Sequence, residues 1–511
     1  MQRLPLATLV VLLLALLARA WVRPVYVGAP EATATASSFG MAEPFGDDLK
    51  GSCDAFHTLL ADSVRREGLA ATGGWPLMNR TTVPPERFFY YDHHPPGVTL
   101  ATALAFEWLG TSEAVARGVA LLFATVTLLV VARLAFVAGG DRAAAFAVVV
   151  VAATPAGLYW ASQLDYPVPT MAGCALFLAL ASQPALTRGR RVVAGAALLA
   201  ALSCDFLAVL APAALFVERL LAGPRGWKRL LGWPLFGAAW TVALLAWKHW
   251  QLSRHGFSDA GDPLAQVALV WSLPAGMSVV DYLQRVEGHL RALVTPLGEG
   301  VLAFGVLRAL LPGSDPLVRR FVRVTTLLAL GAGLLPRLRA QDHPYFQLYW
   351  LLPLAGSALL LALALLGARA AVAPAGGSAA ATPPRGRARE ALAGVAALFA
   401  AMVAGAFVIA GAQALPRSTI DAERPAAHRL GRELAAQVPA ECTLVLVPLE
   451  APIDPIQLTW YAGRMVAKAP GSPPDRTKAI PYLGMYTLDQ VPAWWAPGAK
   501  WPGRDGVTRL E

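Results

Sequence analysis

The chain has 511 residues, of which 56% are hydrophobic and only 15% are charged, with a net charge of +10. Soluble domains carry more charge than this, so the composition excludes an ordinary soluble protein. The positive charge does not indicate nucleic acid, because the Lys and Arg residues gather in every second loop between apolar segments. This is the cytoplasmic excess of basic residues that orients membrane helices, and we expect a lipid bilayer as partner and no nucleic acid.

The first apolar segment lies near residues 4–22, with Arg3 close to its start. Ala18, Arg19 and Ala20 have the small-x-small form of a signal-peptide cleavage site. We nevertheless interpret the segment as an uncleaved membrane anchor, because the many later spans need no separate export signal.

A long polar loop, residues 23–113, follows the anchor and is expected on the outer side. Within it, residues 54–67 place apolar side chains at helical spacing opposite a polar face, which predicts an amphipathic helix that can lie on the membrane surface. Residues 98–109 are apolar but short, and predict either a second interfacial helix or the start of a span.

Ten further apolar runs are nearly free of charge, and several approach the roughly 20 residues that cross a bilayer. They lie near 114–137, 143–160, 167–182, 192–204, 206–222, 231–248, 296–311, 321–336, 345–367 and 388–411. Lipid cannot satisfy exposed backbone groups, so these spans must be helices. We therefore predict a polytopic α-helical membrane protein with about eleven transmembrane helices. With the N-terminus in the cytoplasm, the strongly basic loops and a flexible linker at 369–388, rich in Ala, Pro, Gly and Arg, fall inside. On the outer side we expect a tight turn at residues 203–205, between the spans 192–204 and 206–222, and a loop over about 250–295.

The composition changes after residue 413. Residues 420–437 have the pattern of a helix, and 443–447 are apolar and β-branched, as in a strand. We predict a small outer α/β domain over 413–511. Its tryptophans Trp494, Trp495 and Trp501 suit either the lipid interface or ordinary packing.

Five polar clusters fall on the outer side in this topology, all of them at the ends of spans or in the first outer loop. They are Asp47, Asp48 and Asp54; Asp92, His93 and His94; Asp165 with Tyr166; Asp205; and Gln341, Asp342, His343, Pro344 and Tyr345. Ionisable groups at membrane depth are costly and tend to be functional. Acids and imidazoles on one face suit a divalent cation (magnesium, manganese or zinc) or general-base catalysis.

Several of these residues also have a purely structural interpretation. Asp54 would be the N-cap of the helix that it begins, since Asp is favoured there. Asp165 would be a solvated loop acid. Arg337 and Arg339 would be exceptions to the charge rule, or would bind a phosphate, with which Arg pairs through two hydrogen bonds.

The order of motifs along residues 1–411 resembles bacterial membrane glycosyltransferases of the GT-C superfamily, relatives of protein O-mannosyltransferases and of the lipid A aminoarabinose transferase. The motifs are an amphipathic helix ending in Arg65-Arg66-Glu67-Gly68, then Tyr90-Tyr91-Asp92-His93-His94-Pro95-Pro96, Trp108-Leu109-Gly110, a segment from Glu113 to Arg117, and Asp342-His343-Pro344-Tyr345-Phe346. The resemblance implies a transmembrane catalytic domain over residues 1–411. Its activity would move a sugar from a polyprenyl phosphate to a lipid, glycan or protein acceptor at the outer face of the bacterial cytoplasmic membrane.

The resemblance also implies roles for individual residues. An acid of the first outer loop, Asp48 or Asp54, would be the catalytic base, and Asp165 would match a second acid. Many relatives carry an Asp-Glu pair in that loop, whereas residues 51–55 here have no Glu beside the Asp, so the choice between the two acids stays open. The residues matching a metal position in some relatives are Asp92, His93 and His94. The residues expected to bind substrate and phosphate are Tyr91, Arg337, Arg339, His343 and Tyr345.

A transporter or flippase for a lipid-linked or small polar substrate is the alternative. Transporters commonly hold polar residues in mid-span, at broken helices and in internal repeats. In this chain the polar clusters lie at span ends on one side, and the sequence shows no repeat. The pattern therefore favours an enzyme, and a non-enzymatic scaffold would leave the Asp and His clusters unexplained.

Overall fold

The computed structural model describes most of the helical part of the chain and short pieces of its C-terminal part. The described residues are 6–21, 49–77, 90–91, 93–158, 161, 163–183, 186–223, 231–255, 272–273, 276–313, 315–335, 344–366, 398, 400–409, 428, 431–432, 435–436, 444–448, 455–463, 465–469, 499–500 and 508–509. Some predictions lie outside the described residues and stay predictions. They concern Asp47, Asp48, Asp92, Arg337, Arg339, Asp342, His343, the side chain of Tyr345, the linker 369–388 and the tryptophans Trp494, Trp495 and Trp501.

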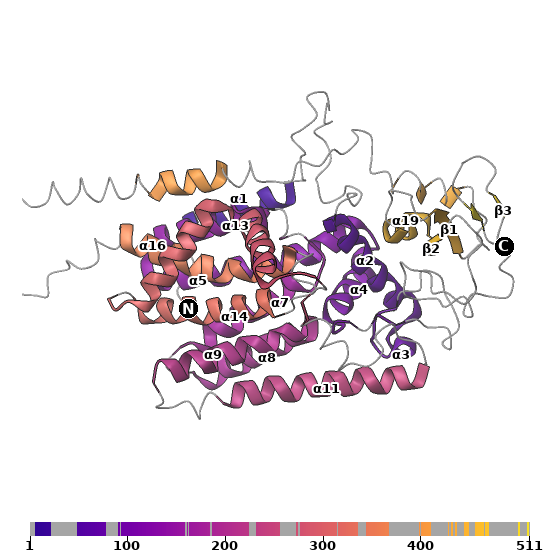
Figure 1. The fold of residues 1–511 in the computed structure, drawn as a ribbon, viewed down its shortest axis with the longest axis horizontal. Coiled ribbons are helices and arrows are strands. Elements are labelled where there is room, and N and C mark those ends of the chain that lie inside the picture. Colours follow the sequence, from indigo (N-terminus) through magenta and orange to yellow (C-terminus); the bar gives the residue numbers. More distant parts are fainter. Residues whose placement is uncertain are drawn as a thin grey trace, which may run out of the picture.

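A group of packed helices forms the main helical body of the molecule, on the left in Figure 1. Their bounds are α1 Leu6–Trp21, α5 Glu113–Ala152, α6 Pro155–Leu158, α7 Pro167–Ala181, α13 Val279–Leu310, α14 Pro316–Leu334 and α16 Leu351–Leu366. Helix α16 contacts α5, α13 and α14, and its side chains are largely buried. Small residues let these helices approach closely. At Gly173 of α7, for example, a Cβ atom would lie 2.8 Å from the backbone oxygen of Ala197 in α8.

Two of the long helices are broken at a single residue. Helix α5 is interrupted at Gly140 (φ 74°), between the predicted spans 114–137 and 143–160. Helix α13 is interrupted at Thr295 (φ 68°), directly before Pro296, where the predicted span 296–311 begins. Residues 279–294 are helical as well, so the prediction of an outer loop over 250–295 is wrong for this part. A capping box between Ser278 and Asp281 starts the additional helix.

A second set of helices lies along one side of this group (Figure 1). It contains α8 Arg188–Cys204, the short 3-10 helix η4 Phe206–Val209, α9 Leu210–Leu221 and α11 Gly232–His255. Asp205 ends α8 and caps η4, because its Oδ1 accepts a hydrogen bond from the backbone N–H of Leu207 (3.1 Å). The turn predicted at residues 203–205 is thus present.

The first outer loop contains α2 Leu49–Glu67, α3 Leu69–Thr72 and α4 Gly97–Leu109. The predicted helices at 54–67 and 98–109 are both confirmed, but α2 begins five residues before Asp54. Asp54 therefore lies inside the helix, and its predicted role as N-cap is wrong. The polar face of α2 does not lie open to the surroundings either. His57, Thr58 and Asp62 of that face are buried against neighbouring elements.

The C-terminal part contains a small mixed sheet. Within the described residues it has the order β2-β1-β4-β3, with β1 Leu444–Pro448 parallel to β2 Met465–Ala469 and antiparallel to β4 Thr508–Arg509, which pairs with β3 Ala499–Lys500. The strand predicted at 443–447 is present as β1. Helix α19, Pro455–Ala462, connects β1 to β2 and contacts α2 (Figure 1). The indole Nε1 of Trp460 donates to Oε1 of Glu113, in the first turn of α5 (3.2 Å).

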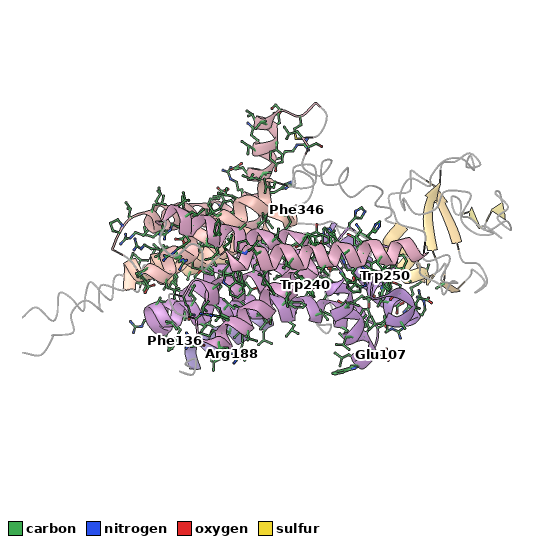
Figure 2. All side chains as sticks on the ribbon, turned by 90° about the horizontal axis from the view of Figure 1, so that it is seen from below. Glu107, Phe136, Arg188, Trp240, Trp250 and Phe346 are labelled. Atoms are coloured by element: carbon green, nitrogen blue, oxygen red, sulfur yellow. The ribbon has the colours of Figure 1, made fainter. Side chains whose placement is uncertain are left out.

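Three described helices are long and apolar enough to cross a membrane: α5, α13 and the segment Phe346–Leu365. Shorter apolar helices accompany them at Gly97–Leu109, Pro167–Ala181 and Ala400–Ile409. These helices are those of a multi-pass membrane protein, whereas the number of about eleven spans stays a prediction. Figure 2 shows the two ends of the helical body, with Phe136 and Arg188 toward one end and Glu107 and Trp250 toward the other.

Candidate active site

The first feature of the candidate site is a fully buried carboxylate on α2. Asp54 is 0% exposed, and its Oδ1 accepts a hydrogen bond of 2.6 Å from the backbone N–H of Leu164, which lies 110 positions away in the sequence. Its Oδ2 lies 3.9 Å from Nε of Arg117, in the N-terminal part of α5. Because a buried carboxylate needs hydrogen bonds or a charge partner, this pair of contacts fixes α2 against the segment that precedes α7.

The same segment supplies the second carboxylate. Asp165 is also buried, and its Oδ1 accepts from the backbone N–H of Tyr166 (2.7 Å) while its Oδ2 accepts from Nε2 of Gln163 (3.0 Å). Nε2 of His57, one turn after Asp54 on α2, lies 3.0 Å from Oδ1 of Asp165. Helix α2 therefore contacts the segment 163–166 twice, through Asp54 with Leu164 and through His57 with Asp165. The prediction that Asp165 is a solvated loop acid is wrong, because this side chain is buried.

His94 joins this pair to a third acid. Its ring stacks on that of Tyr166, with 3.5 Å between the ring centroids and 21° between the planes. Its Nδ1 lies 3.7 Å from Oδ1 of Asp205, whose Oδ2 accepts a hydrogen bond from the hydroxyl of Tyr349 (3.3 Å). Asp205 thus connects the end of α8 with His94 and with η5, Pro344–Trp350.

Burial lowers the pKa of His94 below its ordinary value, and the neighbouring Asp205 and Asp165 only partly oppose this effect. Burial disfavours the charged form of an imidazole. His94 is therefore neutral at neutral pH and offers one ring nitrogen as acceptor.

A close approach of two helix ends positions His94. Gly97, the first residue of α4, has no side chain, and a Cβ atom there would lie 2.4 Å from the backbone oxygen of Ser203. The start of α4 consequently lies directly on the end of α8. Pro95 and Pro96 stiffen the chain between His94 and this contact.

Aromatic rings line the same region. The ring of Tyr91 lies edge-on to Phe56 of α2 (4.9 Å between centroids) and to His93 (5.3 Å). Phe346, from η5, meets Tyr166 at 6.2 Å. Rings of this kind offer apolar faces and hydrogen-bonding edges to a polar ligand.

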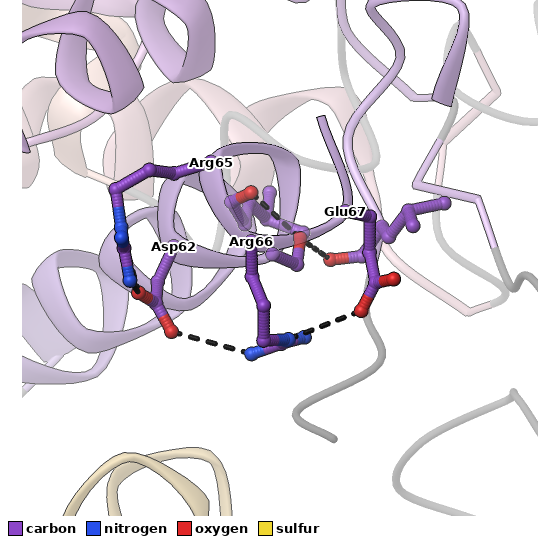
Figure 3. A network of polar contacts seen from close by, with 7 residues as sticks. Asp62, Arg65, Arg66 and Glu67 are labelled. Carbon is purple, nitrogen blue, oxygen red and sulfur yellow. Dashed lines mark hydrogen bonds and ion pairs between the residues drawn. The ribbon is translucent and has the colours of Figure 1, made fainter. Parts of the chain in front are cut away.

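The charged end of α2 forms a network of its own (Figure 3). Asp62 accepts from Nη2 of Arg65 (3.0 Å) and from Nη1 of Arg66 (3.3 Å), and Arg66 also donates to Glu67 (3.1 Å). The Arg65-Arg66-Glu67 motif thus forms, together with Asp62, a local network of ion pairs at the end of α2.

The structure thus gathers many of the residues predicted to form the site, and adds others. The predicted residues that it brings together are Asp54, Asp165, Tyr91, His93, His94 and Asp205. The residues that sequence reasoning missed are His57, Arg117, Gln163 and Tyr349. Of these four, only His57 could have been found from the sequence. It lies three residues after Asp54, and this spacing places both side chains on one face of a helix.

The predicted divalent metal would need several His, Cys, Asp or Glu side chains close together. Among the described residues no group of three His, Cys, Asp or Glu side chains is arranged to hold a metal ion. His93 and His94 do not share a ligand position either, since His93 contacts the edge of Tyr91 while His94 stacks on Tyr166. The described residues therefore do not fit a metal, and the predicted site depends on Asp92, outside them.

The arrangement of the helices is that of the GT-C fold, which the sequence motifs led us to expect. The structure is similar to that of ArnT from Cupriavidus metallidurans, both in the apo state (TM-score 0.56) and bound to undecaprenyl phosphate (TM-score 0.58). The sequence identity is 16% in both comparisons. The similarity to the apo structure spans 90% of this chain and 84% of ArnT, and that to the lipid-bound structure spans 91% and 85%.

The oligosaccharyltransferase of Archaeoglobus fulgidus is also similar. In its apo form it gives a TM-score of 0.52 at 14% identity, with 90% of this chain covering 64% of that protein. No protein-family model matches the sequence, and the comparison with curated proteins finds no match. At these identities the comparisons establish a shared fold with ArnT and the oligosaccharyltransferase, both GT-C proteins.

Proposed function

We propose that this protein is an integral membrane glycosyltransferase that moves a sugar from a polyprenyl-phosphate donor to a lipid, glycan or protein acceptor. The observation that carries the proposal is that Asp54 and Asp165 are both buried where α2 packs on residues 163–166, at one end of a GT-C fold, and that each is held by separate partners. Similar proteins have been seen with lipid phosphates, namely ArnT with undecaprenyl phosphate and the archaeal oligosaccharyltransferase with dolichol-phosphate. A bacterial cytoplasmic membrane, with the site at its outer face, is the location that we propose.

The chemistry assigns Asp54 as general base. An acceptor hydroxyl loses its proton to this carboxylate as its oxygen bonds to the anomeric carbon, and the bond from that carbon to the phosphate oxygen breaks. Arg117 holds Asp54 from one side, and His57 holds Asp165 from α2. We choose Asp54 over Asp48 because it lies at the centre of these contacts.

In this structure the segment 163–166 covers Asp54, since the Leu164 N–H binds Oδ1 and the side chain is fully buried. An acceptor reaches the carboxylate only when this segment moves away from α2. In its closed position the segment would exclude water from Asp54 until the acceptor is bound, as closed loops do in other enzymes.

The departing lipid phosphate carries negative charge that a cation must stabilise. His94 is neutral and does not supply it. We propose Arg337 and Arg339 for this role, with His343 and Tyr345 beside them, because the chain segment that carries them leads into η5, which contacts Asp205 and Tyr166. Tyr91 would stack on the sugar.

A transporter is less well supported. The buried acids lie together near one end of the helical body, and the helix breaks at Gly140 and Thr295 coincide with boundaries of predicted spans. Transport sites instead lie near the middle of the bilayer.

The test is a loss-of-function comparison in a strain that lacks this protein. Mass spectrometry of the cell-envelope glycans, lipids and proteins should show a missing sugar, restored by the wild-type chain. Asp54→Asn and Asp165→Asn should restore about a hundredth of it or less, since each removes a carboxylate used in the reaction. Wild-type amounts of the sugar in the strain expressing Asp54→Asn would show that Asp54 is not the base, and an unchanged envelope without the protein would refute the proposed function.

A further inference from the structure

A cavity of about 500 Å³ lies between α9, α13 and α14. Its walls combine apolar side chains with three charged ones, Glu218, Arg319 and Arg323. The lining residues are Glu218, Leu221, Ala222, Val306, Leu310, Arg319, Val322, Arg323, Thr326 and Leu327. Such a combination of an apolar pocket with a few polar groups is typical of ligand sites.

The cavity is at the opposite end of the helices from the buried acids. Helix α9 starts after the η4 turn that Asp205 caps and runs twelve residues to Leu221, a length of roughly 18 Å. The cavity lies at the far end of α9 and in the first half of α14, whereas η5, the next described element after α14, contacts Asp205. Arg188, at the start of α8, marks the same far end (Figure 2).

The charged wall has a surplus of positive charge. Glu218 is 3% exposed and binds two arginines, with its Oε2 3.0 Å from Nε of Arg320 and its Oε1 2.5 Å from Nη2 of Arg323. Nη1 of Arg320 also donates to the backbone oxygen of Ser182 (3.0 Å), which ties the end of α7 to α14. One buried glutamate thus faces two arginines here, and Arg319 adds a third.

Part of this positive charge has no partner within the described residues. Nη1 of Arg319 donates to the backbone oxygen of Leu311 (2.8 Å), but its Nε is buried without a hydrogen bond. Nη2 of Arg320, which adjoins the cavity through Glu218 but does not line it, is also buried without one. A buried donor that remains unsatisfied costs free energy, which a bound anion would recover.

The apolar wall is open toward the outside of the helical body. Leu221 is 78% exposed and Leu310 is 66% exposed, although both line the cavity. Val306 and Leu327 continue the apolar surface inward. A long hydrocarbon chain can lie along these residues while a charged head reaches the arginines.

We propose that this cavity binds an anionic membrane phospholipid, with its phosphodiester at Arg319, beside the ion pair of Arg323 and Glu218, and one acyl chain along Leu221, Val306 and Leu310. The ligand is the bilayer's own lipid and not the polyprenyl-phosphate donor, because the buried acids lie at the other end of the helices. Basic pockets between transmembrane helices on the cytoplasmic side bind anionic head groups in this way. The lipid would hold α9, α13 and α14 together at the inner face.

Native mass spectrometry of the full-length protein tests the proposal. The protein is incubated in detergent with phosphatidylglycerol, phosphatidylethanolamine or undecaprenyl phosphate, and bound lipid is counted for each. We expect phosphatidylglycerol to bind at least about fivefold more tightly than phosphatidylethanolamine. Arg319→Gln, which removes a cation without touching Glu218, should lower this affinity about fivefold, and Val306→Trp, which fills the apolar wall, should do the same.

Arg188→Gln is the matched control, because it removes an exposed arginine of the same end that does not line the cavity. It should bind as the wild type does. Thermal unfolding in detergent checks that Arg319→Gln and Val306→Trp remain folded. Equal binding of phosphatidylglycerol to the wild type and both cavity variants would overturn the proposal. So would tighter binding of undecaprenyl phosphate that the same two variants abolish, and either result leaves the transferase assignment of Asp54 untouched.

Discussion

His57 holds Asp165 from α2 and links it to the helix that carries Asp54. Its Nε2 lies 3.0 Å from Asp165 Oδ1, and its Nδ1 is buried without a hydrogen-bond partner among the described residues. With the Nε2 proton directed at Asp165, Nδ1 is an acceptor to which a substrate hydroxyl can donate a hydrogen bond. His57 is therefore a positioning residue for Asp165.

The first prediction concerns this contact. His57→Leu removes the ring nitrogens and leaves a buried oxygen of Asp165 without one of its partners, which should cost about 1–3 kcal/mol of unfolding free energy. His57→Gln keeps a donor near Asp165 and should lose less stability, while kcat falls about tenfold or more with little change in KM.

Steady-state transfer kinetics with a lipid-linked sugar, together with thermal unfolding, measure both effects. His249→Gln on α11 is the control, since that residue is exposed. Loss of stability without loss of kcat in both variants of His57 would show that the contact is structural only.

His94 provides the second prediction, because burial lowers its pKa in the folded protein. The groups that face it are Asp205, Asp165, His93 and Tyr166. The unfolded chain binds its proton near an ordinary pKa of about 6.5, whereas the folded chain does so only at lower pH. Stability is therefore complete above about pH 6.5 and falls as the pH drops below that value, until the folded-state pKa is reached.

Thermal unfolding between pH 8 and pH 5 should show this loss in the wild type. His94→Gln cannot take up a proton and should have a flatter profile, with the difference confined to the acid side. If the two profiles fall in parallel, another group is responsible for the acid sensitivity.

At the scale of the elements, the contact between α4 and α8 decides where His94 lies. Gly97→Ala would place a methyl group 2.4 Å from the backbone oxygen of Ser203, which cannot move without shifting α8. We expect a loss of about 1–3 kcal/mol. Since α4 must then move away, His94 should also separate from Asp205, and transfer activity should fall with stability.

The control for this substitution is Gly300→Ala in α13, where a Cβ atom would meet nothing within 4 Å. It should be neutral or slightly stabilising, because Ala favours a helix by about 1 kcal/mol over Gly. Calorimetric unfolding and a transfer assay on both variants give the comparison. If Gly97→Ala leaves both the stability and the transfer activity unchanged, the ends of α4 and α8 are further apart than the structure shows.

At the scale of the whole molecule, the acids and the arginine-rich cavity lie at opposite ends of the helical body. Basic residues favour the cytoplasmic side. The acid-bearing end should therefore face the outside. Glu107 and Arg188, both exposed, mark the two ends (Figure 2).

Cysteine labelling in intact cells tests this orientation. The four native cysteines are first replaced by alanine, and a single cysteine is then introduced as Glu107→Cys or Arg188→Cys. A membrane-impermeant maleimide should label the first variant in intact cells and the second only after the membrane is opened. The reverse pattern would place the acids inside and contradict the proposed site at the outer face.

The sequence predicted a good part of the fold, because hydrophobic runs and helical spacing are local properties. The helices at α2 and α4, the start of the span after Thr295 and the turn at Asp205 were found in this way. The extra helix at 279–294 was missed, since its apolar pattern is weak and it sits in what looked like a long outer loop. The N-cap role of Asp54 was wrong because the helix starts earlier, within a segment whose apolar residues are sparse.

The sequence by itself determined the membrane-spanning composition, the basic ends of the helices and the identity of most acids and imidazoles that matter, since these depend on residue type and spacing. Only the tertiary structure decided that Leu164 lies on Asp54, that His57 reaches Asp165 and that His94 stacks on Tyr166 beside Asp205. Such contacts join segments far apart in the chain. They follow from how whole helices pack, which depends on every small residue along their surfaces and not on any one motif.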